Sequence, residues 1–116
     1  MVITDSPLTI THHASTDGQR IALSGDLDYT NSPDLDTLLR DLELRAGDTL
    51  TLDLGNLVFC DSTGLSTLIS AQRTAASAGA ALTVSTIDVK LARVMEITGV
   101  DHLFGITEET VRTEAV

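Results

Sequence analysis

Hydrophobic and polar residues alternate in the first part of the chain in a way that predicts two β-strands. In residues 8–13 and 20–25 the apolar positions recur at every second residue, the period of a strand with one buried face. The residues between them, Ser15 to Gly18, are typical of tight turns, because Gly18 can adopt a positive φ. The sequence therefore predicts an N-terminal β-hairpin.

A helical period begins at Ser32-Pro33. The apolar positions that follow form one stripe at i, i+3, i+4 and i+7: Leu35, Leu38, Leu39 and Leu42. We expect Ser32 to cap this helix, since its hydroxyl can accept a free backbone N–H, and Pro33 suits the first helical position. Gly47-Asp48 is expected to end the unit.

The rest of the chain alternates between predicted strands and helices. Strands are expected at 49–54, 81–85 and 103–106. Helices are expected at 62–78, ended by Gly79, and after a cap at Asp88, ended by Gly99, with a weakly patterned helix at 108–116. The order up to Gly99 is β-β-α-β-α-β-α, and residues 103–116 form a short tail. This order predicts an α/β fold with a largely parallel sheet, made mixed by the hairpin.

Composition limits the partners that the chain can have. Its 116 residues make one domain, and 17 acidic against 7 basic residues give a formal net charge of −10. Such a surface repels nucleic acid and anionic membranes, so we expect neither as a partner and favour a basic protein surface. The absence of a signal-like N-terminus and of a long apolar run predicts a cytoplasmic protein.

Candidate metal and cofactor ligands are few. Cys60 is the only cysteine, which excludes a disulfide within the chain and a cysteine-based metal site. His12 and His13 are adjacent in a predicted strand and point to opposite faces, so they cannot chelate one ion together. A small buried thiol is the favoured interpretation of Cys60, and we expect no cofactor.

The turn after the third predicted strand is the most informative segment. An apolar run, Leu57 to Phe59, stops at Asp61, Ser62, Thr63 and Gly64, and an amphipathic helix follows at once. Any of the first three side chains can cap that helix. A serine at a helix N-terminus also suits phosphorylation, because free N–H groups and the helix dipole favour the added negative charge.

A third interpretation makes Ser62 a nucleophile. That chemistry needs a base, usually a histidine, and nothing in the spacing brings His12, His13 or His102 to Ser62. The nucleophile-elbow pattern G-x-S-x-G is also absent, since Cys60 stands where its first glycine belongs. Catalysis is therefore the least favoured of the three hypotheses for Ser62.

A second polar cluster follows the second predicted strand. Gly25-Asp26-Leu27-Asp28-Tyr29-Thr30 precedes the first helix. If the two strands run parallel, this turn and the Ser62 turn lie at the same sheet edge, where α/β proteins place their sites. The other interpretation, an acidic loop with local caps, is equally compatible with the spacing.

Three segments together resemble the STAS domain of bacterial anti-sigma factor antagonists, over residues 8–107. Gly25-Asp26-Leu27-Asp28, with Thr30 nearby, is similar to the family's G-E-L-D turn. Leu52-Asp53-Leu54, followed by Phe59 to Leu65, resembles the signature L-D-L…F-x-D-S-[ST]-G-L. Residues 94–100 with Leu103-Phe104 resemble the end of the third helix and the entry to the last strand. The resemblance implies a mixed sheet of four to five strands with helices mainly on one face.

The resemblance also implies a mechanism without catalysis by this chain. It implies that Ser62 is phosphorylated by an anti-sigma factor that is also a serine kinase, and that a serine phosphatase of the PP2C type reverses this. Unphosphorylated antagonist would bind the anti-sigma factor and free the sigma factor, as in stress-response and sporulation switches. Asp61, Thr63 and Gly64 would surround the phosphosite, flanked by Asp26, Asp28 and Thr30.

Two departures and two rival functions accompany this resemblance. Asp26 stands where the family commonly has Glu, which keeps the charge and shortens its reach, and the C-terminal stretch is less amphipathic than usual, which predicts a short last helix. STAS-like domains also serve as non-switching accessory modules of transporters or stress-signalling assemblies. The second rival is a small serine hydrolase, which would need a base within about 2.6–3.2 Å of Ser62.

Overall fold

A computed structural model describes residues 1–5 and 7–112 of the chain. The strands are β1 (Val2–Asp5), β2 (Leu8–Ser15), β3 (Gly18–Leu27), β4 (Thr49–Cys60), β5 (Ala81–Asp88) and β6 (Val111–Arg112). The helices are α1 (Ser32–Asp41), α2 (Ser62–Ala78) and α3 (Val89–Thr98), with a 3₁₀ turn, η1 (Asp101–Phe104). Among these described residues, no helix is both long enough and apolar enough to cross a membrane.

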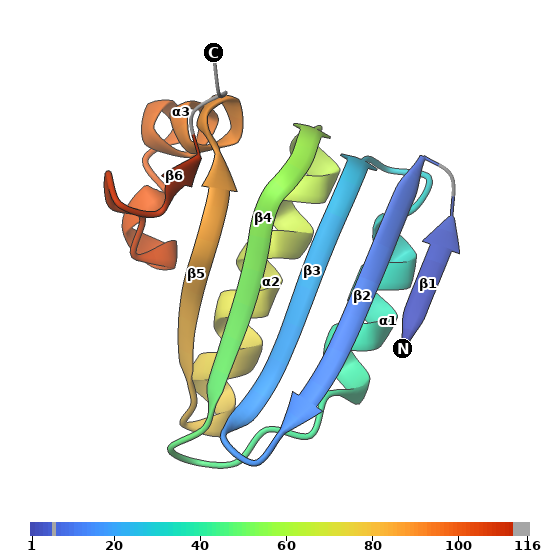
Figure 1. The fold of residues 1–116 in the computed structure, drawn as a ribbon, viewed down its shortest axis with the longest axis vertical. Helices are drawn as coiled ribbons and strands as arrows, with labels where there is room; N and C mark the ends of the chain where they lie inside the picture. Colours follow the sequence, from blue (N-terminus) through green and yellow to red (C-terminus); the bar gives the residue numbers. More distant parts are fainter. Residues whose placement is uncertain (6, 113–116) are drawn as a thin grey trace.

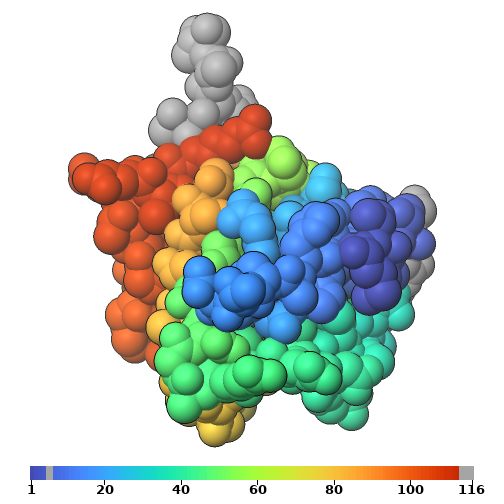
Figure 2. Space-filling model, turned by 60° about the horizontal axis from the view of Figure 1, so that its bottom comes forward, coloured from blue at the N-terminus to red at the C-terminus, as the bar shows by residue number. Residues whose placement is uncertain are grey.

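The strands form one mixed sheet in which spatial order follows chain order, from β1 to β6. The β1–β2 and β2–β3 pairs are antiparallel, whereas β3, β4, β5 and β6 are parallel. Each parallel crossover advances in the same direction, and crossovers are right-handed, so their helices lie on one face of the sheet. Figure 1 shows α1 and α2 behind the sheet, and β1 and β6 at its opposite edges, and Figure 2 shows the N-terminal strands and residues 101–112 on opposite sides of the molecule.

The core lies between the sheet and these helices and is almost entirely aliphatic. Every second residue on the inner face of β2, β3 and β4 is a leucine or isoleucine. Ile21 and Leu23 on β3, and Leu50 and Leu52 on β4, are all buried. The leucine stripe of α1 covers this layer with Leu35, Leu38 and Leu39. The period-2 and period-3.6 patterns in the sequence therefore identified the two surfaces that meet in the core.

The predicted α/β fold with a mixed sheet and helices on one face is confirmed, and so is the hairpin. Residues Ser15 and Gly18 pair across its turn, with Gly18 at φ +143°. A Cβ at Gly18 would lie 2.0 Å from the Thr49 carbonyl oxygen, so the turn packs too closely against β4 for any other residue. Gly79 and Gly99 end α2 and α3 in the left-handed conformation, as predicted, and Asp88 caps α3 through the Lys90 N–H.

Several local predictions are wrong. The sheet has six strands because β1 and the two-residue β6 form its edges, and both were too short to give a pattern. Residues 103–106 are not a strand: Leu103-Phe104 belong to η1, which ends at Gly105 with φ +62°. The predicted helix at 108–116 is a turn followed by β6 as far as residue 112, and residues 113–116 lie outside the described residues.

Candidate functional site

The acidic turn after β3 and the Ser62 turn after β4 lie side by side. The two strands are parallel neighbours, and their last residues, Leu27 and Cys60, are register partners. The backbone N–H of Asp61 donates to the Leu27 carbonyl at 3.1 Å, which continues the pairing beyond the strands. The expectation that both turns occupy the same sheet edge is therefore confirmed.

Asp61 is the side chain that connects these two turns. It is the N-cap of α2, where its Oδ1 accepts the Gly64 backbone N–H at 2.7 Å. Its Oδ2 accepts the Tyr29 backbone N–H, from the acidic turn, at 3.0 Å. Of the three possible caps, Asp61 thus takes the role, and it uses its second oxygen to fix the neighbouring turn.

Ser62 is consequently left with an exposed side chain at the first position of α2. Thr63 is exposed too, and neither hydroxyl has a hydrogen-bond partner among residues 1–5 and 7–112. His12, by contrast, bonds Gln19 on the neighbouring strand. No hydrogen bond within the described residues connects Ser62 to a histidine or lysine.

Gly64 is buried where α2 approaches the end of β3. A Cβ at this position would lie 2.7 Å from the Leu27 carbonyl oxygen and 3.0 Å from the Cys60 Sγ. A side chain here would push the N-terminus of α2 away from the strand. The glycine therefore sets how closely Ser62 lies to the acidic turn.

The acidic turn is held by its own side chains. The Asp28 carboxylate accepts the Thr30 backbone N–H at 2.9 Å and the Thr30 hydroxyl. Buried Asn31 accepts the Asp28 N–H and donates to the Asp26 carbonyl, each at 2.9 Å. Ser32 does not cap α1 as predicted: its hydroxyl donates to the Asp28 carbonyl at 2.6 Å, and the cap position is Asn31.

This geometry shifts the pKa values of two side chains, Asp28 and Cys60. The hydrogen bond from the Thr30 hydroxyl lowers the pKa of Asp28 below its ordinary value, so this carboxylate is ionised at neutral pH. Burial raises the pKa of the Cys60 thiol to about 12, with a smaller contribution from the Asp61 charge. The acidic turn therefore carries negative charge beside Ser62, and the Cys60 thiol is protonated and weakly nucleophilic.

Three large apolar side chains near Ser62 were missed by sequence reasoning. Tyr29 is 72% exposed on the acidic turn, and Val58 and Phe59, at the end of β4, are 61% and 53% exposed. A strand pattern assigns alternate residues to the core, so two consecutive exposed apolar residues give no signal that the sequence alone can read. The exposure of Val58 and Phe59 can be deduced only when the register between β3 and β4 is known.

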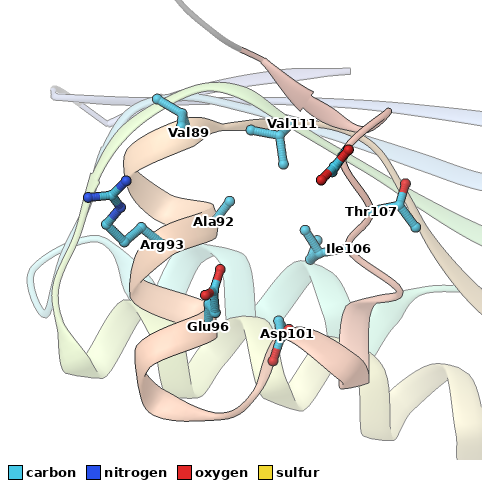
Figure 3. A pocket seen from close by; sticks show the side chains of 9 residues that line it. Val89, Ala92, Arg93, Glu96, Asp101, Ile106, Thr107 and Val111 are labelled. Atoms are coloured by element: carbon cyan, nitrogen blue, oxygen red, sulfur yellow. The ribbon is translucent and has the colours of Figure 1, made fainter.

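A cavity of about 250 Å³ lies between α3, η1 and the segment that leads to β6 (Figure 3). Its lining mixes apolar Ala92 and Ile106 with Arg93 and the acids Glu96 and Asp101. None of the residues that surround Ser62 lines it. Within the described residues no group of three or more histidine, cysteine or acidic side chains is arranged to hold a metal ion.

Comparison with known proteins agrees with this architecture. The family model described as "Mlab, STAS domain" matches residues 10–108. The match spans most of the sequence, and the chain belongs to the STAS family. The resemblance drawn from the three sequence segments is therefore confirmed at the level of the family.

Solved structures show the same fold. An anti-sigma factor antagonist from Mycobacterium paratuberculosis superposes with a TM-score of 0.67 at 20% identity, covering 90% of this chain and 91% of that one. The antagonist SpoIIAA in its unphosphorylated form gives 0.63 at 16% identity, covering 90% and 89%. A sulfate transporter family protein from Wolinella succinogenes gives 0.67 at 18% identity, covering 85% and 79%. Antagonists and a transporter-family protein thus share this chain's fold.

Proposed function

We propose that this chain is an anti-sigma factor antagonist that is switched by phosphorylation of Ser62. In its unphosphorylated form it binds an anti-sigma factor that is also a serine kinase, which frees the sigma factor for transcription. Phosphorylation of Ser62 releases the partner, and a PP2C-type serine phosphatase restores binding. The protein acts in the cytoplasm as substrate and binding partner, and the chemistry belongs to the kinase and the phosphatase.

The observation that carries the proposal is that Asp61, and not Ser62, caps α2. Asp61 caps α2, so the Ser62 hydroxyl is exposed and needs no rearrangement of the helix to reach a kinase. A phosphate there adds about −1.5 to −2 charges at pH 7 beside the N-terminus of a helix, whose dipole favours them. The domain can therefore accept the modification without unfolding.

The same charge explains release. Asp61 and the ionised Asp28 already surround the turn, with half-buried Asp26 beside them. A partner surface that matches these carboxylates would have to accommodate about 1.5 to 2 further negative charges at its contact with Ser62. Desolvation or like-charge repulsion of that size costs several kcal/mol, and about 4 kcal/mol already weakens binding roughly a thousandfold.

Phosphate transfer to defined variants tests the proposal. Purified serine-kinase anti-sigma factors from the same genome are incubated with the protein and labelled ATP, and the modified residue is mapped by mass spectrometry. Wild type and Thr63→Ala should be labelled at Ser62, whereas Ser62→Ala should not be labelled. Label on Thr63 in Ser62→Ala, at the wild-type rate, would contradict the assignment.

The likeness to a sulfate transporter family protein, at a TM-score equal to that of an antagonist, supports a second candidate. In that function the chain is a non-switching accessory module of a transporter. Its partner would then bind equally well to the wild type and to Ser62→Glu. The switch proposal requires the glutamate variant to bind its partner more weakly, so a comparison of the two affinities separates the functions.

A further inference from the structure

The end of β4 exposes two consecutive apolar side chains because the strand is irregular there. The register between β3 and β4 passes from Gly25 opposite Leu57 to Asp26 opposite Phe59, so Val58 has no partner on β3. Such a bulge changes the direction of the side chains around it. As a result Val58 and Phe59 are both more than half exposed, immediately before the Ser62 turn.

Helix α3 places a third apolar side chain against this strand end. Leu91 and Met95 face the core, whereas Val94 is 41% exposed and Lys90, one turn earlier, is exposed. Val94 and Lys90 meet the strand end in a groove of about 240 Å³, which we call the β4–α3 groove. It is lined by Val58, Phe59, Cys60, Lys90, Leu91 and Val94.

Charge limits what can occupy the β4–α3 groove. The chain has a formal net charge of −10, and the groove lies next to Asp61 and to Asp88, the cap of α3. Lys90 is the single charged residue in the groove lining. A second copy of the chain would bring a like-charged surface to this contact, and an anionic membrane would be repelled as well. A basic protein surface fits if its protruding apolar side chain enters the groove and its cations lie against Asp61 and Asp88, away from Lys90.

We propose that the β4–α3 groove is the docking pocket for an apolar side chain on the basic surface of the anti-sigma factor kinase. This inference rests on the proposed function and adds the contact that directs the kinase to Ser62. Cys60 lines the groove and Ser62 follows two residues later, so a partner anchored there lies over the phosphorylated turn. A few buried anchor side chains, often aromatic, supply most of the binding energy in protein interfaces.

The test compares groove variants with a matched surface control. Phe59→Ser and Val94→Ser remove apolar side chains that are partly exposed, so both variants should fold, which urea unfolding checks. Val2→Ser is the control, because Val2 is 62% exposed and lies on β1, at the opposite side of the molecule (Figure 1). Affinity for the purified kinase is measured by calorimetry, and Ser62 phosphorylation is followed by steady-state kinetics.

We expect each groove variant to weaken binding about 10- to 100-fold and to raise the KM for phosphate transfer, with kcat nearly unchanged. Val2→Ser should stay within about twofold of wild type.

Groove variants that bind like wild type, while wild type is phosphorylated at Ser62, would overturn this inference alone. A wild type that neither binds a kinase nor is phosphorylated would overturn the proposed function, and the inference with it. A wild-type dimer that Phe59→Ser and Val94→Ser convert to monomer would assign the groove to self-association instead and overturn the inference.

Discussion

The backbone N–H of Tyr29 donates a hydrogen bond to the Asp61 carboxylate at 3.0 Å, across 32 positions of sequence. Because the other oxygen of the same carboxylate caps α2, one side chain holds the acidic turn and the Ser62 turn in a fixed relation. The position of Ser62 relative to Asp28 therefore depends on Asp61 more than on any local property of the serine.

Replacing Asp61 by alanine should cost more stability than replacing an ordinary helix cap. Asp61→Ala removes the cap and the contact with Tyr29, a loss of about 1–3 kcal/mol. Asp88→Ala is the control, since Asp88 caps α3 through the Lys90 N–H, and should cost about 0.5–2 kcal/mol. Urea unfolding measures both. Equal losses, with unchanged hydrogen exchange of the Tyr29 amide in Asp61→Ala, would contradict the bridging role.

Gly64→Ala should destabilise the domain although alanine is the better helix former. The added Cβ would lie 2.7 Å from the Leu27 carbonyl oxygen, and overpacking of this kind costs about 1–3 kcal/mol. Helix propensity alone would gain about 1 kcal/mol. Ser66→Ala, at an exposed position on the same helix, should change stability by no more than about 0.5 kcal/mol. A Gly64→Ala protein as stable as Ser66→Ala would show that the close approach to Leu27 is not needed.

The stability of the domain should fall as pH rises from about 9 towards 12, partly through Cys60. Burial raises the pKa of this thiol from its ordinary value of 9.0 to about 12. Above pH 9 the unfolded chain loses the thiol proton and the folded chain keeps it, so unfolding becomes more favourable. Unfolding free energies of wild type and Cys60→Ala, measured at pH 8 and pH 10.5, check this. The wild type should lose more stability between the two pH values, and parallel losses would contradict the buried thiol.

The Thr30 hydroxyl should control the titration of Asp28. It is the main cause of the lowered pKa of Asp28, so Thr30→Val should raise that pKa towards its ordinary value of 3.8. The stabilisation that comes from the lowered pKa is present above 3.8 and is lost as pH falls through the folded-state value. Carboxyl ¹³C shifts followed by NMR report the titration. Thr51→Val, on β4, should leave it unchanged, and an unchanged Asp28 titration in Thr30→Val would refute the contact.

The sequence could predict the features that repeat along the chain, such as the apolar faces of strands and helices. It could not predict those that depend on how neighbouring strands are paired. The apolar periods of 20–25 and 35–42 predicted β3 and α1, because one buried face repeats many times. The Leu103-Phe104 pair was too short to show a period, and it forms the end of the 3₁₀ turn η1, which stops at Gly105. Ser32 looked like a cap because its type fits, but the hydroxyl has a partner in the Asp28 carbonyl.

The candidate site was predictable in part for the same reason. The location of both turns at one sheet edge followed from parallel strands. The choice of Asp61 as the cap, and its second bond to Tyr29, did not, because both depend on the register of Leu27 with Cys60. The exposure of Val58 and Phe59 depends on the bulge between β3 and β4, and no alternating pattern signals such an extra residue.

The most direct test of the proposed switch at Ser62 is a pair of affinities measured for one anti-sigma factor kinase. Protein that carries phosphate on Ser62, verified by mass spectrometry, is compared by calorimetry with the unphosphorylated protein, and Ser62→Ala serves as the form that cannot be modified. We predict that the phosphorylated form binds about a thousandfold more weakly, and that Ser62→Ala binds like the unphosphorylated wild type. Equal affinities of the phosphorylated and unphosphorylated forms would contradict the account.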